Sequence, residues 1–145
     1  FVRILRSGKP LPEERESMFW LNIKGIPAMD SAPDKNMVQF AINSRIKLIY
    51  RPAALKNAIP EKFAEKLEWS AEGRDIKVKN TSPLYMNFSE ITVNGKSVPE
   101  AWFVAPFSTI KIPVANTSLP GKKKITWSVI NDYGMPGPKY TAIIQ

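Results

Sequence analysis

The chain has 145 residues, with 21 Lys and Arg against 13 Asp and Glu, a formal net charge of +8, 13 prolines, and neither Cys nor His. Without Cys or His it offers no thiolate nucleophile, no imidazole base, no disulfide and no conventional zinc site, so an enzyme or a metal centre is a poor starting hypothesis. The positive charge suggests nucleic acid as a partner, but the densest basic run is only Lys122-Lys123-Lys124 beside a Pro-Gly turn, which is typical of a solvated strand end.

The first part of the chain alternates apolar and polar residues with a period of two, which is typical of β-strands. This pattern predicts a short strand over residues 2–6 and a second one over residues 18–24, with a charged, proline-broken connector between them. In the second strand, Phe19, Leu21 and Ile23 fall on one face. Residues 25–35 contain two prolines among small or charged side chains and are predicted to form a loop.

The longest alternation covers residues 38–50, where every even position except Ser44 is apolar or aromatic. These apolar positions are Val38, Phe40, Ile42, Ile46, Leu48 and Tyr50. A typical strand has only about 5 or 6 residues, whereas this one would extend about 43 Å at about 3.3 Å per residue. A small sandwich cannot cover such a strand, so either it bends between two layers or part of it is reserved for another chain.

After Arg51-Pro52, residues 53–66 hold the helical content, with the best short helix at residues 61–67. Short apolar stretches then alternate with turn residues, and Asn94-Gly95 is a strong two-residue hairpin signal. The predicted strands lie at residues 67–69, 75–79, 86–93, 102–104, 109–112, 125–130 and 140–144. Roughly seven short strands with this spacing are typical of an immunoglobulin-like β-sandwich.

The predicted fold class is therefore all-β, with a domain boundary after residue 52. Residues 53–145 are long enough for a complete sandwich, whereas residues 1–52 hold three strands and too little chain for an independent core. Apolar strands without partners readily pair with another copy, so self-association of the first part is one expectation. No apolar stretch approaches the roughly 18 to 20 residues that a membrane span needs, and no membrane insertion is expected.

Three motifs, in this order along the chain, carry a family resemblance. They are Leu11-Pro12-Glu13-Glu14-Arg15-Glu16-Ser17 followed by Phe19-Trp20-Leu21-Asn22, then Ser44-Arg45-Ile46-Lys47-Leu48-Ile49-Tyr50-Arg51-Pro52, then Ile130-Asn131-Asp132-Tyr133-Gly134. With these motifs the chain resembles the periplasmic chaperones of the chaperone–usher pilus assembly pathway. The resemblance implies two immunoglobulin-like domains in an L or boomerang arrangement, the first of which is incomplete here.

The resemblance also implies about 70 further residues before Phe1, which in the family hold the first strands of the N-terminal immunoglobulin-like domain. They would follow a signal peptide that is removed on export to the periplasm. The predicted loop over residues 25–35 is short, which matches the short-loop branch that serves rod-like fimbriae. The implied partners are fimbrial subunits and the outer-membrane usher, with no cofactor, no metal and no nucleic acid.

By the same resemblance, one half of the long strand would be a donor strand that fills the groove of an incomplete pilus subunit. Its apolar residues would be Val38, Phe40 and Ile42. The apolar residues of the other half would pack in the chaperone's own core, namely Ile46, Leu48 and Tyr50. Periodicity alone leaves the alternative open that all six pack in the home sandwich.

The resemblance assigns roles to four charged residues. Lys47 would bind the C-terminal carboxylate of the subunit and set the register of the added strand; the alternative is an ordinary solvated lysine. Glu16, Arg51 and Asp132 would form a charge cluster between the two domains and fix the interdomain angle. In the family, an arginine on the first strand shares the carboxylate-binding role with this lysine. That first strand is absent from this sequence.

Two other classes of function compete with this interpretation. An immunoglobulin-like adhesive or carbohydrate-binding module could stack sugars on tryptophan rings, although Trp69 and Trp127 lie in strand patterns and are expected in the core. A nucleic-acid binder is suggested by net charge alone. An enzyme is the weakest choice, because no pair of carboxylates with a defined spacing accompanies the missing Cys and His.

Overall fold

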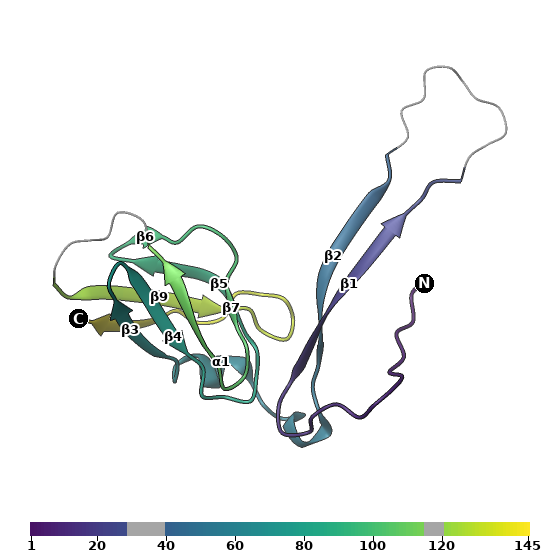
Figure 1. The fold of residues 1–145 in the computed structure, drawn as a ribbon, viewed down its shortest axis with the longest axis horizontal. Coiled ribbons are helices and arrows are strands. Elements are labelled where there is room, and N and C mark those ends of the chain that lie inside the picture. Colours follow the sequence, from purple (N-terminus) through teal and green to yellow (C-terminus); the bar gives the residue numbers. More distant parts are fainter. Residues whose placement is uncertain (29–39, 115–120) are drawn as a thin grey trace, which may run out of the picture. The chain divides into compact units, whose positions relative to one another are not determined.

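The computed structural model describes residues 1–28, 40–114 and 121–145 (Figure 1). The chain divides into two compact units, one formed by residues 17–50 and the other by residues 1–16 together with residues 51–145. Regular structure is nearly all β, as predicted; the helices of the described ranges are a 3-10 turn at Ala53–Leu55 and α1 at Pro60–Ala64. Among the described residues, no helix is both long and apolar enough to span a membrane.

Residues 17–50 form a long antiparallel hairpin of two strands, β1 (Ser17–Gly25) and β2 (Ile42–Tyr50) (Figure 1). The pairing runs without interruption from Ser17 opposite Tyr50 to Gly25 opposite Ile42. Directly opposed residues share a face of a sheet, so one face of the hairpin is apolar and the other carries the charges. The apolar face holds Phe19, Leu21, Ile23, Ile42, Ile46, Leu48 and Tyr50; the charged face holds Lys24, Arg45 and Lys47 with Trp20.

Residues 51–145 form an immunoglobulin-like sandwich of two sheets. One sheet has the order β3 (Glu68–Glu72), β4 (Asp75–Lys79), β8 (Thr109–Pro113). The other has the order β10 (Tyr140–Ile144), β9 (Lys123–Val129), β5 (Met86–Val93), β6 (Lys96–Ser97), with β7 (Phe103–Val104) also paired to β5. The predicted strands at 75–79, 86–93 and 140–144 are confirmed to the residue. Asn94 and Gly95, with φ of 49° and 80°, make the predicted tight turn between β5 and β6.

The core of the sandwich is built from the inward-facing residues of both sheets. Trp127 of β9 is 2% exposed, and its ring centroid lies 5.1 Å from that of Trp69 on β3. The indole N–H of Trp127 donates to the carbonyl of Ala64 at 2.9 Å, which ties α1 to β9. Both tryptophans are therefore engaged in core packing, as the strand pattern predicted.

Two local predictions are wrong. Residues 2–6 form no strand in the described chain, because an extended segment becomes a strand only where a neighbour pairs with its backbone groups. Lys123 is not solvated but only 8% exposed, because it begins β9 on the same inward-facing set of residues as Ile125. The long aliphatic stem of a lysine can cover apolar surface in this way.

Candidate functional site

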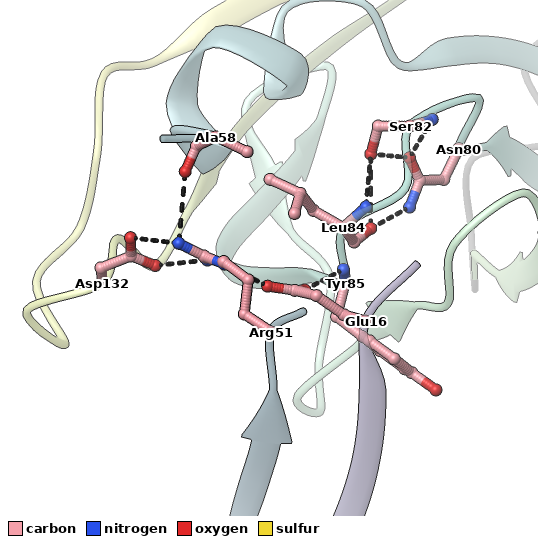
Figure 2. A network of polar contacts seen from close by, with 8 residues as sticks. All are labelled: Glu16, Arg51, Ala58, Asn80, Ser82, Leu84, Tyr85 and Asp132. Carbon is pink, nitrogen blue, oxygen red and sulfur yellow. Dashed lines mark hydrogen bonds and ion pairs between the residues drawn. The ribbon is translucent and has the colours of Figure 1, made fainter. Parts of the chain in front are cut away.

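Arg51 is the centre of a charge cluster in the unit that contains the sandwich (Figure 2). Its Nε donates to Oε1 of Glu16 at 2.7 Å, and its two terminal nitrogens donate to the two carboxylate oxygens of Asp132, each at 2.7 Å. One terminal nitrogen also donates to the carbonyl of Ala58 at 3.2 Å. The hydrogen bonds to Asp132, and then the one to Glu16, raise the pKa of Arg51 above its usual range.

Glu16 is the buried member of this cluster, with a side chain that is 1% exposed. Its Oε2 accepts the backbone N–H of Tyr85 at 2.7 Å, and its own backbone N–H donates to the carbonyl of Pro83 at 2.9 Å. Both carboxylate oxygens therefore have a partner, which a buried charge requires. The structure brings Glu16, Arg51 and Asp132 together; that the cluster fixes an interdomain angle stays a prediction.

The turn that receives Glu16 is held by a second network, centred on Asn80, which is 1% exposed (Figure 2). Asn80 Nδ2 donates to the carbonyls of Leu84 at 2.7 Å and Ala105 at 3.1 Å. Its Oδ1 accepts the backbone N–H of Ser82 at 3.0 Å and the Ser82 hydroxyl at 2.7 Å. Because Pro83 lies inside this turn and Tyr85 directly after it, Asn80 fixes the backbone groups that bind Glu16.

Asp132 reaches the cluster from the loop between β9 and β10. The side-chain oxygen of Asn131 accepts the backbone N–H of Tyr133 at 3.0 Å and of Met135 at 2.9 Å, and the N–H of Gly134 donates to the Asn131 carbonyl at 3.0 Å. Asparagine commonly closes a loop on its own backbone in this way. The closed loop presents the Asp132 carboxylate, whose side chain is 48% exposed.

Two of the three predicted donor-strand residues are described, whereas Val38 lies outside the described residues. Phe40 precedes β2 and is 75% exposed, and Ile42, the first residue of β2, is 69% exposed. Of the predicted strand over residues 38–50, Ile42–Tyr50 form β2, whereas Phe40 and Ala41 are described but lie outside any strand. Large exposed apolar side chains at alternate positions are what a strand needs to fill the groove of another protein.

The second half of the long strand is less buried than predicted. Ile46 is 49% exposed, Leu48 and Tyr50 are half-buried, and none of the described residues within 17–50 is fully buried. Two strands form a single layer, and a core requires a second layer. The predicted packing of these residues in a core is therefore absent from the described hairpin.

Lys47 lies on the charged face of the hairpin, directly opposite Trp20. Its Nζ is 5.8 Å from the centroid of the Trp20 ring, and partial burial lowers the pKa of Lys47 through loss of water around the ammonium. The guanidinium carbon of Arg45 lies over the same ring at 4.1 Å. Sequence reasoning found the two cations on one face but missed Trp20, because only the register of β1 against β2 shows what faces them.

The chain matches two family models. Residues 62–141 match the model described as "Pili assembly chaperone PapD, C-terminal domain", and residues 1–56 match "Pili and flagellar-assembly chaperone, PapD N-terminal domain". Together the two matches cover nearly the whole chain, and they follow one another in the order that the three sequence motifs predict.

Individual relatives agree with these matches. The chain is 40% identical over 148 residues to chaperone protein FimC of Escherichia coli K12, covering 99% of this chain and 58% of that protein. It is 39% identical over 149 residues to chaperone protein caf1M of Yersinia pestis, covering 92% of this chain and 57% of that protein.

Solved structures give the same result. The E. coli chaperone DraB superposes with a TM-score of 0.78 at 36% identity, covering 97% of this chain and 64% of DraB. The Salmonella enterica SafA pilin in complex with the SafB chaperone gives a TM-score of 0.83 at 32% identity, covering 96% of this chain and 64% of the matched chain.

The chain thus spans a little over half the length of the curated relatives it matches. The fold, the order of the three motifs and the two family models agree with one another. The chain belongs to the family of PapD-like pili assembly chaperones.

Proposed function

We propose that the protein is a periplasmic chaperone that captures pilus subunits by donor-strand complementation, caps them and delivers them to an outer-membrane usher. The observation that carries this proposal is the run of exposed apolar side chains at alternate positions, Phe40 and Ile42, leading into β2. A strand of this kind adds main-chain hydrogen bonds to an open sheet edge and fills pockets with alternate side chains, and chaperone–pilin complementation is an established instance. The relative SafB is in complex with a pilin.

The proposal includes the division of the chain and the roles of its charged residues. Residues 1–52 would belong to the subunit-binding domain and residues 53–145 would form the C-terminal domain, a division supported by family matches that end at 56 and begin at 62. Lys47 would bind the subunit's terminal carboxylate, and the Glu16–Arg51–Asp132 cluster would fix the interdomain angle.

Family membership supports the remaining parts of the proposal. The protein acts by binding and not by catalysis, and a signal peptide is removed when it reaches the periplasm. The short-loop assignment rests on residues 25–35, most of which lie outside the described residues, and stays a prediction. A carbohydrate-binding module is less well supported, because the core packing of Trp69 and Trp127 leaves fewer rings for a sugar.

Replacing Phe40 with Glu is expected to weaken capture of a pilus subunit by more than about 100-fold, because the groove would have to bury an unpaired carboxylate. The change should leave the sandwich unit folded, since Phe40 is exposed. The measurement is co-purification with a pilus subunit and the affinity for it, using the full-length protein. Ala41→Glu is the matched control, because it adds the same charge at the next position, where an extended strand points the other way. Equal affinities for the two variants would contradict the donor-strand assignment.

Replacing Lys47 with Ala is expected to weaken subunit capture by about 30-fold or more, because truncating one partner of a hydrogen-bonded charge pair leaves the other charge unpaired. A subunit whose chain is extended by one residue past its natural terminus should bind the unaltered chaperone poorly and should be nearly insensitive to Lys47→Ala. A Lys47→Ala protein that binds the natural subunit with unchanged affinity would remove Lys47 from the site.

A further inference from the structure

The described hairpin concentrates its charge on one face. Its only charged residues within 17–28 and 40–50 are Lys24, Arg45 and Lys47, all cationic and all on the face opposite the apolar one. Arg45 and Lys47 are two positions apart on β2, so their backbones are about 6.6 Å apart. Like charges this close on one face of a strand repel each other. A neighbouring group that interacts with both cations would offset this repulsion.

Trp20 is the group that the structure places against both cations. The guanidinium carbon of Arg45 lies 4.1 Å from the ring centroid and the Lys47 Nζ lies 5.8 Å from it, both within the range of a cation–π interaction. The register accounts for the contact, because Trp20 is directly opposite Lys47 and diagonal to Arg45 across the ladder. One indole ring thus holds two cations beside each other.

The geometry leaves hydrogen-bond donors available at an accessible position. A guanidinium carries five N–H donors in its own plane, and contact with one ring does not use them all. Trp20 is 43% exposed and Arg45 is exposed, and no ion pair of Arg45 is found in the described ranges. A carboxylate has two oxygens, each of which accepts charge-assisted hydrogen bonds from a different cation.

We propose that Trp20, Arg45 and Lys47 form a receptor for one carboxylate, in which Arg45 is a second ligand beside Lys47 and Trp20 is the positioning residue that holds the two cations together. The inference rests on the proposed function, because the carboxylate would be the terminus of the bound subunit. It adds to that function a second cation on β2 itself and an aromatic ring that sets its position.

The test uses acetate as the probe and acetamide as its neutral analogue, with the protein as its gene encodes it. The NMR signals of the Arg45 Nε–H and the Lys47 ammonium should both shift with acetate and stay unchanged with acetamide. Arg45→Gln should weaken acetate binding about tenfold, and Trp20→Leu about fivefold, whereas Trp20→Phe should retain most of the affinity. Lys24→Gln is the matched control, because it removes the same charge from the same face, and it should change the affinity by less than about twofold.

The outcomes separate this inference from the proposed function. If Trp20→Leu and Arg45→Gln bind acetate and the subunit as well as Lys24→Gln does, while Lys47→Ala fails, the two-cation receptor is overturned and the proposed function stands. If the unaltered protein captures no subunit, the proposed function fails as well; if Phe40→Glu and Lys47→Ala capture the subunit normally, only the donor-strand and carboxylate-anchor assignments fail. Arg45→Gln keeps the indole and the strand pairing. Its comparison with Lys24→Gln therefore tests whether Arg45 binds the carboxylate, even where Trp20→Leu disturbs the hairpin.

Discussion

Replacing Arg51 with Met is expected to lower the free energy of unfolding of the sandwich unit by about 3 to 5 kcal/mol at neutral pH, because it leaves the Glu16 carboxylate buried without its cation. Glu16 has a side chain that is 1% exposed, and its remaining partner would be the N–H of Tyr85. The measurement is urea unfolding followed by tryptophan fluorescence, to which the buried Trp127 contributes.

The matched control for Arg51 is its other acid. Asp132→Asn removes a negative charge that is paired with the same guanidinium. The Asp132 side chain is 48% exposed, so water replaces the lost ionic contact, and the expected cost in unfolding free energy is below about 1 kcal/mol. In the double variant Glu16→Gln with Arg51→Met, much of the stability should return, because no charge is then left buried. Equal costs for Arg51→Met and Asp132→Asn would show that burial of Glu16 does not control the energetics of the cluster.

Replacing Asn80 with Ala is expected to cost about 3 kcal/mol of unfolding free energy. The substitution removes the side-chain partner of the N–H of Ser82 inside the buried turn and of the part-buried carbonyl of Ala105 outside it, and each unsatisfied buried group costs about 1 to 3 kcal/mol. The turn also presents its backbone to Glu16, so the loss should extend to the charge cluster. Urea unfolding gives the size of the effect, and hydrogen exchange of the Tyr85 amide reports on the turn itself.

Asn131 is the matched control, because its side-chain oxygen, like that of Asn80, accepts backbone N–H groups of the turn that follows it, here those of Tyr133 and Met135. Those groups lie in an exposed loop, where water can replace the lost acceptor, and Asn131→Ala should therefore cost less than about 1 kcal/mol. If the two alanine variants were equally stable, burial of the Asn80 network would not be what makes it important.

The strands of the sandwich were predicted well from the sequence because turn residues flank each of them. Asp75–Lys79 is flanked by Gly73 and by the Asn80–Pro83 turn, and Met86–Val93 ends at Asn94-Gly95, so both strands were found to the residue. The segment at residues 2–6 has the same alternation but no strand, because alternation does not show whether a neighbour pairs with it. Strand prediction from one sequence succeeds where local signals suffice and fails where pairing decides.

The candidate site was also predictable only in part. The family motifs brought Glu16, Arg51 and Asp132 into one cluster, and the structure places them within hydrogen-bonding distance. The main-chain partners of the cluster were not predictable, because every residue has a backbone carbonyl and nearly every residue has a backbone N–H, so the residue type does not show which of them binds the cluster. Asn80 was seen only as a turn residue, and its burial depends on how the two sheets of the sandwich close over it.

The ion pair between Glu16 and Arg51 also affects the conformational entropy of the chain between them. These two residues immediately precede β1 and follow β2, and the first cross-strand pair, Ser17 with Tyr50, is next to them. The contact therefore closes the whole of residues 17–50 into a loop and reduces the entropy that pairing of the two strands must overcome. It also starts the ladder at one register, from which the remaining pairs follow in sequence. A charge pair outside the hairpin thus helps to determine which side chains share each of its faces, since a slip of one residue would exchange them.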